Sequence, residues 1–65
     1  MQIRLNGELI DTTAKDLAAL IEDRGFDVTV VATALNGEFV PRALRGETPL
    51  AEGDAVEVLR PMQGG

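Results

Sequence analysis

The sequence predicts a small α+β domain in which one helix covers one face of a small mixed sheet. Two stretches, "LNGELI" and "LNGEFV", each place an Asn-Gly pair between short apolar segments, which is typical of a two-residue β-hairpin. One amphipathic segment separates these hairpins, and a further alternating segment, "AVEVL", follows the second. The predicted order is therefore hairpin, helix, hairpin, connecting stretch and final strand.

The first hairpin is predicted at the start of the chain. In "MQIRLN" apolar and polar residues alternate, so that one face of the strand is buried. Asn6-Gly7 forms the turn, because both of its residues tolerate a positive φ, and "ELID" returns as the second strand. The apolar members of the two strands are Met1, Ile3, Leu5, Leu9 and Ile10.

The segment "TTAKDLAALIEDRGF" predicts the helix. Thr13 with Asp16 three residues later resembles a capping box, so the helix is expected to begin at Thr13. Gly25 is expected to end it in the left-handed conformation. The predicted core-facing stripe consists of Leu17, Leu20 and Ile21, with Ala14 and Ala18 beside it.

The second hairpin is predicted in "VTVVATALNGEFVPR", with Asn36-Gly37 as its turn and Pro41 ending its returning strand. Val31, Thr33 and Leu35 are predicted to share one face of its first strand, and Ala32 and Ala34 the other. The stretch "ALRGETPLAEGD" then connects to the final strand and holds one helical turn. In "AVEVLR" the inward residues are Val56 and Val58, and Glu57 faces outward. Alternation alone leaves the partner of this strand open. A domain is predicted over residues 1–60, and residues 61–65 form an exposed tail ending in Gly-Gly.

Composition narrows the classes of function. The 65 residues include no Cys, His, Tyr or Trp, so a self-sufficient hydrolase, redox protein or transition-metal enzyme is not expected. The sequence accordingly predicts neither catalytic residues nor a metal site. A net charge of −5 disfavours nucleic acid and anionic membranes and favours a basic protein partner. We see no pattern of a signal peptide or membrane span, and therefore expect a cytoplasmic protein.

Gly64 and Gly65 follow the predicted last strand and have no evident folding role. One interpretation is ordinary terminal fraying. The other is that the carboxylate of Gly65 is the working group, since five residues reach at most roughly 17 Å and glycines fit a narrow slot. A carboxylate needs activation, most simply as an acyl-adenylate made from ATP, after which an amine or a sulfur nucleophile displaces AMP. With no Cys in the chain, any carried sulfur would sit at this terminus.

Three apolar residues form a candidate docking patch. Alternation places Leu59 on the sheet face opposite the helix, and Phe39 and Met62 are expected beside it. Incidental exposure is the competing explanation, because single exposed apolar residues are common. The functional alternative is a surface that binds a partner protein next to the tail, with Met62 adaptable to more than one partner.

Several stretches, taken in order, show a family resemblance. The segments "MQIRLNGE", "ALNGEFVPR" and "EGDAVEVL" and the terminal "GG" together resemble the thiamine-biosynthesis sulfur carrier family (ThiS), over the whole chain. The resemblance implies a ubiquitin-like β-grasp fold, in which the final strand lies in the centre of the sheet. The family's central motif is matched at Asn36, Gly37, Pro41 and Arg42, for which we expect a structural role. The segment "RPMQ" before the glycines is more polar than the family pattern.

The resemblance also implies a reaction cycle. An E1-like adenylating enzyme would activate the carboxylate of Gly65 with ATP, and a sulfur donor such as a cysteine desulfurase would convert it to a thiocarboxylate. Thiazole synthase would then take the sulfur. In this scheme Gly64 and Gln63 give access to the terminus, the chain binds no cofactor, and ATP is consumed by the partner. The chain is thus expected to be a protein cosubstrate and not an enzyme.

Three alternatives remain open at this point. The related sulfur carrier of molybdopterin synthesis shares the fold and the Gly-Gly end. A ubiquitin-like modifier would use the same adenylate but deliver the acyl group to lysines of target proteins. A plain interaction module would have an inert tail.

Overall fold

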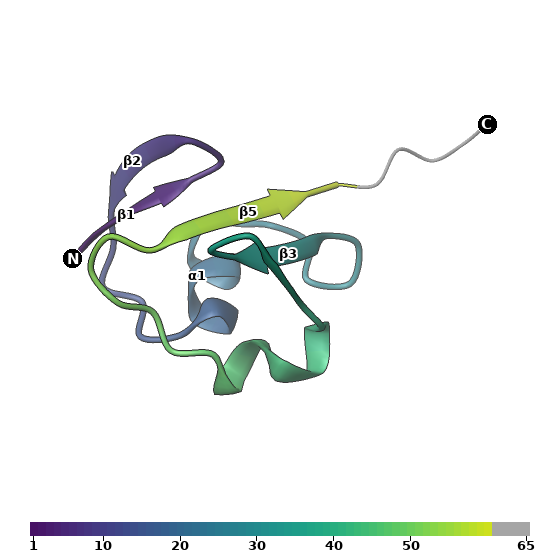
Figure 1. The fold of residues 1–65 in the computed structure, drawn as a ribbon. Helices are drawn as coiled ribbons and strands as arrows, with labels where there is room; N and C mark the ends of the chain where they lie inside the picture. Colours follow the sequence, from purple (N-terminus) through teal and green to yellow (C-terminus); the bar gives the residue numbers. More distant parts are fainter. Residues whose placement is uncertain (61–65) are drawn as a thin grey trace.

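The computed structural model describes residues 1–60, which form a five-stranded sheet and a short α-helix (Figure 1). The elements are β1 (Gln2–Leu5), β2 (Glu8–Asp11), α1 (Leu17–Asp23), β3 (Ala32–Leu35), β4 (Glu38–Val40), the 3₁₀ helix η1 (Arg42–Glu47) and β5 (Ala55–Leu59). The strand order is β2-β1-β5-β3-β4. This is the predicted arrangement of two hairpins, one helix and a final strand.

The last strand occupies the centre of the sheet. β5 runs parallel to β1, with Arg4 opposite Ala55, and antiparallel to β3, with Thr33 opposite Val58. Both hairpins therefore join one sheet through β5, as Figure 1 shows. The central, parallel placement that the family resemblance implied is confirmed, and the fold is a ubiquitin-like β-grasp.

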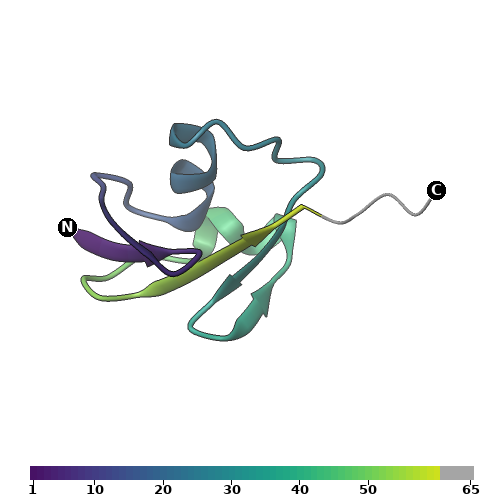
Figure 2. The same ribbon diagram turned by 90° about the horizontal axis from the view of Figure 1, so that it is seen from above.

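One face of the sheet carries the core. α1 lies on this face in Figure 2, and the other face, which we call the outer face, is not covered by any element within residues 1–60. The core residues alternate along the strands and follow the predicted stripe of the helix. They are Ile3, Leu5, Ala14, Leu17, Leu20, Ile21, Val31, Val40, Leu50, Val56 and Val58. The predicted core stripe is confirmed, because Leu17, Leu20 and Ile21 are fully buried.

Both hairpins turn at their Asn-Gly pairs as predicted. Asn6 and Gly7 have φ values of 53° and 82°, and Asn36 and Gly37 have values of 51° and 85°. Positive φ at both positions is the geometry of a type I′ turn, whose twist matches that of the flanking strands. The turns follow Leu5 and Leu35 directly, so two residues join each pair of strands.

The helix begins later than predicted. Asp16, in extended conformation, is its N-cap, and Asp16 Oδ1 accepts a hydrogen bond of 2.8 Å from the N–H of Ala19. The expectation that Thr13 caps the helix is wrong. Backbone hydrogen bonds from Leu50 to Lys15 and from Leu17 to Thr48 hold the approach segment extended beside the chain after η1. The helix ends as predicted, with Gly25 at φ 77°.

The second hairpin is shorter than its apolar run suggests. The stretch "VTVVATALNGEFVPR" begins at Val28, but β3 begins at Ala32. Residues before it form a turn in which the Asp27 carboxylate accepts hydrogen bonds from the Thr29 N–H at 3.0 Å and the Thr29 hydroxyl at 2.6 Å. This local capping competes with strand pairing and leaves Val30 partly exposed. Val31 and Thr33 are both buried, so the face that they were predicted to share is the one turned toward the core.

Candidate functional site

The outer face carries two of the three predicted docking residues. Phe39 is 70% exposed and Leu59 is 61% exposed. Phe39 lies opposite Ala34 in the β3–β4 pair, and Leu59 lies opposite Ala32 in the β3–β5 pair. The two large side chains thus stand on either side of a strand whose outward residues are alanines.

The alanines leave a shallow depression between Phe39 and Leu59. Its volume is about 80 Å³, and its lining residues are Ala32, Thr33, Ala34, Phe39, Glu57 and Leu59. We call it the outer hollow. One carboxylate, that of Glu57, borders it, so the hollow is mainly apolar with one acidic edge. Met62, Gln63, Gly64 and Gly65, the other predicted site residues, lie outside the described residues.

The end of β5 is held on its β1 side by a side chain. Nδ2 of Asn6 donates to the Val58 carbonyl at 3.2 Å, and Oδ1 of Asn6 accepts from the Val58 N–H at 2.8 Å. Up to this point the contacts are between backbones, since the N–H groups of Arg4 and Asn6 donate to the carbonyls of Asp54 and Val56. The Asn6 amide therefore continues the parallel ladder after the backbone has turned away.

The Asn36 side chain also makes two hydrogen bonds to this part of the chain, at the other end of β5. Its Oδ1 accepts from the Ala55 N–H at 2.9 Å, and its Nδ2 donates to Oδ1 of Asp54 at 3.1 Å. The backbone N–H of Asn36 also donates to the Ala55 carbonyl at 2.7 Å. The structural role expected for Asn36 in the family motif is thus to fix where β5 begins. No pattern in the sequence predicts that Asn6 acts beyond its turn.

Arg45 is a buried residue that the sequence interpretation missed. It is only 4% exposed, and its guanidinium donates to the Thr33 hydroxyl at 3.0 Å and to the carbonyls of Val28 at 3.0 Å and Val31 at 2.7 Å. Burial lowers the pKa of Arg45, and the neighbouring charge of Arg42 lowers it further. Arg45 ties η1 to β3 and to the loop before it.

The loop between α1 and β3 lies near the end of β5. The pKa of Asp27 is lowered chiefly by the hydrogen bond from the Thr29 side chain and then by that from the Thr29 backbone. The positive charges of Arg60 and Arg42 lower it slightly more. Asp27 and Arg60 therefore place acidic and basic groups on the surface where the described chain leaves the sheet.

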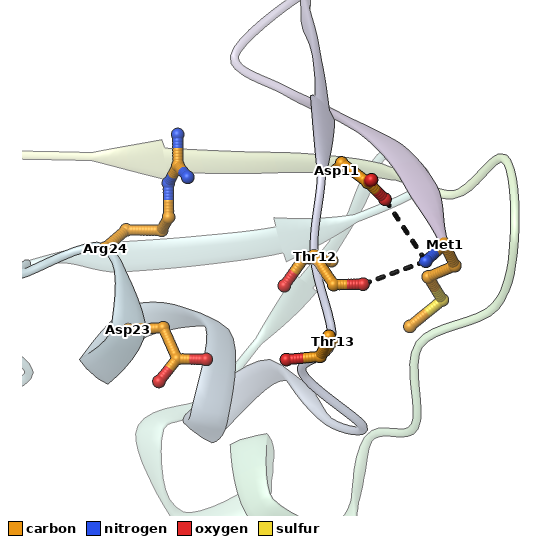
Figure 3. Close-up of a pocket in the computed structure, with 6 residues that line it drawn as sticks. All are labelled: Met1, Asp11, Thr12, Thr13, Asp23 and Arg24. Carbon is orange, nitrogen blue, oxygen red and sulfur yellow. Dashed lines mark hydrogen bonds and ion pairs between the residues drawn. The ribbon is translucent and has the colours of Figure 1, made fainter.

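A polar hollow of about 400 Å³ lies at the opposite end of the central strands (Figure 3). The ammonium of Met1 lies 3.3 Å from an Asp11 carboxylate oxygen and donates to the Thr12 carbonyl at 2.9 Å. Gln2, the next residue, contacts the backbone of Gly53, just before β5 begins. This hollow is thus separated from the end of β5 by the length of the strand, and we assign it no part in the site.

The described residues contain neither a cluster of three or more His, Cys, Asp or Glu side chains that could hold a metal ion nor a helix suited to span a membrane. Glu52 and Asp54, the acidic residues just before β5, instead accept hydrogen bonds from backbone N–H groups. The Glu52 carboxylate accepts from the Gln2 N–H at 3.1 Å through either oxygen, and Asp54 accepts from the Ala51 N–H at 2.8 Å.

Comparisons with known proteins match this chain to one family over all or nearly all of its length. Residues 3–65 match the model of the ThiS family. A sulfur carrier protein ThiS from Thermus thermophilus is 39% identical over 61 residues, which cover 94% of this chain and 95% of the relative. The crystal structure of a thiamine biosynthesis protein (ThiS) from Geobacter metallireducens is 29% identical, with a TM-score of 0.86 and complete coverage of both chains. An NMR solution structure of a thiamine biosynthesis protein from the same organism is 30% identical, with a TM-score of 0.81, covering all of this chain and 88% of the other. The chain belongs to the ThiS family.

Proposed function

We propose that this protein is a sulfur carrier of thiamine biosynthesis and that it carries the sulfur as a thiocarboxylate on Gly65. The observation that carries the proposal is the similarity to ThiS proteins over essentially the full length, with a family match that runs through Gly65. The fold supports it, because the central strand β5 leads directly into residues 61–65. A central strand paired on both sides is a rigid base for the segment that follows it.

The proposed chemistry takes place at the acyl carbon of Gly65. The carboxylate attacks the α-phosphorus of ATP and releases pyrophosphate, which gives an acyl-adenylate. A sulfur nucleophile then attacks the acyl carbon and AMP leaves, so that one carboxylate oxygen departs with AMP and sulfur takes its place. With hydrosulfide as the simplest donor, the products are the thiocarboxylate, AMP and a proton. Gly64 gives the activating enzyme close access to the terminus, because glycine lacks a Cβ, and Gln63 precedes it in the same access segment.

In this proposal the chain is a cosubstrate that other proteins act on. Its partners are an E1-like adenylating enzyme, a sulfur donor such as a cysteine desulfurase, and thiazole synthase. The chain itself holds no cofactor, and the ATP is consumed by the adenylating enzyme. Residues 1–60 serve as the recognition domain and residues 61–65 as the reactive tail, acting in the cytoplasm.

The outer hollow is the proposed docking surface for the adenylating enzyme. Phe39 and Leu59 expose large apolar side chains there, and Leu59 is the last residue of β5. A partner that covers these side chains would therefore have its active site within reach of the tail. Met62 is proposed to extend the same contact. Aromatic residues and Met are enriched at protein interfaces relative to the rest of the surface, which favours Phe39 and Met62 as contact residues.

The proposed function can be tested by mass spectrometry of the intact chain after incubation with the adenylating enzyme, ATP and sodium sulfide. Exchange of oxygen for sulfur has nominally the same mass as oxidation of one methionine, and the chain has two. We would therefore alkylate the product with iodoacetamide and locate the adduct by fragmentation. Because the chain has no Cys, thiol alkylation does not interfere.

An ATP-dependent adduct on Gly65 is the expected result. The control is a chain that lacks Gly65, which should fold normally but carry no sulfur, because the core is formed by residues from Ile3 to Val58. A truncated chain that still supports growth without thiamine would contradict the proposal. Adenylation followed by attachment to lysines of other proteins would indicate a ubiquitin-like modifier instead. Sulfur transfer that restores molybdopterin synthesis but not thiazole synthesis would indicate the related carrier.

A further inference from the structure

We propose that Asn6 is a positioning residue that keeps the end of β5 in the sheet. The adenylating enzyme then binds the tail where it extends from a strand end of fixed position. This inference rests on the proposed function and adds to it a residue far from Gly65 in the sequence.

The register shows what the Asn6 side chain replaces. Along β5, the carbonyls of Asp54 and Val56 accept from the backbone N–H groups of Arg4 and Asn6. This ladder advances by two residues per step, so the Val58 carbonyl would next accept from the N–H of residue 8. The chain has turned back at Asn6-Gly7 by then, and β2 pairs with β1 on its far side. Nδ2 of Asn6 supplies the donor that the Val58 carbonyl would otherwise lack, and Oδ1 of Asn6 supplies the acceptor for the Val58 N–H.

Without this amide, the β1 side of β5 would lose its contact after Val56. The strand would then be held only by β3, through the Thr33–Val58 and Ala32–Leu59 pairs. A terminal strand segment paired on one side opens more readily than one paired on both. Any enzyme that binds the tail would then have to order the end of β5 as well, and this ordering would reduce the free energy of binding.

Asn36 provides a matched control. It too is the first residue of an Asn-Gly turn, has nearly the same positive φ, and makes two side-chain hydrogen bonds at β5. Those bonds lie at Ala55 and Asp54, where β5 begins. The variants Asn6→Gly and Asn36→Gly remove equivalent side chains at opposite ends of one strand, and glycine accepts the positive φ without strain.

The experiment measures carrier-dependent AMP formation by the adenylating enzyme, with the wild-type chain and both variants, well below their unfolding temperatures. We expect Asn6→Gly to raise KM for the carrier by about five-fold, the order of one hydrogen bond, with kcat nearly unchanged. Asn36→Gly should leave KM near the wild-type value. Equal KM values for the two variants would overturn the proposal, as would an unchanged KM for Asn6→Gly.

Hydrogen exchange provides a readout that needs no enzyme. In the wild-type chain the Val58 N–H should exchange slowly because it donates to Asn6, and in Asn6→Gly it should exchange much faster, while Asn36→Gly leaves it protected. Rapid exchange at Val58 in the wild type would overturn the inference even if the variant failed to fold. Failure of the proposed function is recognised separately, because the wild-type chain itself would then form no adenylate.

Discussion

The side-chain amide of Asn6 pairs with both backbone groups of Val58, 52 residues later in the chain. It fills the position of a peptide group in the ladder between β1 and β5. Asn36 makes the corresponding contact at Ala55, so the two Asn-Gly turns clamp the central strand near its two ends. The repeated "LNGE" thus corresponds to two similar turns, in each of which the Asn side chain accepts a hydrogen bond from a backbone N–H of β5.

These contacts predict similar losses of stability when either side chain is removed. Each of Asn6→Gly and Asn36→Gly deletes two hydrogen bonds and should lower the free energy of unfolding by about 1–2 kcal/mol. Chemical denaturation of both variants and of the double variant measures this. The losses should add, because the two contacts lie at different residues of β5. A loss at one position only would show that the two amides are not equivalent.

Much of this fold could be predicted from local patterns, because alternation, turn residues and helix spacing act over short distances. The central position of β5 could not, since Val56 and Val58 would alternate in the same way at an edge of the sheet. The helix start was misplaced because Thr13 and Asp16 are both good caps, and only the pairing of the approach segment with residues 48–50 decides between them. The family resemblance, not alternation, supplied the strand order.

The candidate site could be predicted only in part, because it too depends on contacts between residues that are far apart in the sequence. Alternation along β5 predicts that Leu59 lies on the face opposite the helix, and the structure confirms it. Phe39 lies beside the same hollow because β3 separates β4 from β5, and alternation does not predict that strand order. Arg45 could not be foreseen, because a charged residue in a connecting stretch is usually solvated. Its burial depends on the carbonyls of Val28 and Val31, which the tertiary fold brings to it.

Arg45 should therefore contribute strongly to stability. Arg45→Met keeps much of the side-chain volume but leaves the Thr33 hydroxyl and two loop carbonyls without their donor. We expect a loss of about 2–4 kcal/mol in the free energy of unfolding. Arg42→Met is the control, because Arg42 is an exposed arginine of the same 3₁₀ helix and its replacement should change stability by less than about 0.5 kcal/mol. Comparable effects in denaturation curves would contradict the role assigned to Arg45.

The core stripe of the helix can be tested with a pair of leucines. Leu20 is fully buried, so Leu20→Ala should lower the free energy of unfolding by about 2–5 kcal/mol, a large part of the stability of so small a domain. Leu9 is 55% exposed on the outer face, and Leu9→Ala should cost far less. Thermal unfolding compares the two variants. A midpoint for Leu20→Ala that stays near the wild-type value would mean that the helix packs through a different face.

The loop before β3 should loosen in acid. The folded pKa of Asp27 lies below its ordinary value of 3.8, because the ionised carboxylate accepts two hydrogen bonds from Thr29. The contribution of this group is therefore complete above about pH 4 and is lost as the pH falls through the lower, folded pKa. An NMR titration of the carboxyl carbon measures the value directly. In Asp27→Asn the Thr29 N–H should stay protected in acid, and a pKa at or above 3.8 in the wild type would contradict the assignment.

The outer hollow should set the affinity for the adenylating enzyme. Phe39→Ser and Leu59→Ser each remove a large exposed apolar side chain and should raise KM for the carrier by roughly ten-fold, the effect of losing one strong interface residue. Their effect on folding should be small because both side chains are mostly in solvent. Leu44→Ser is the matched control, since Leu44 is 48% exposed but lies on η1, which packs with α1. Kinetics of AMP formation compare the three variants. If Leu44→Ser raised KM as much as the other two, the enzyme would be binding apolar surface in general and not the outer hollow.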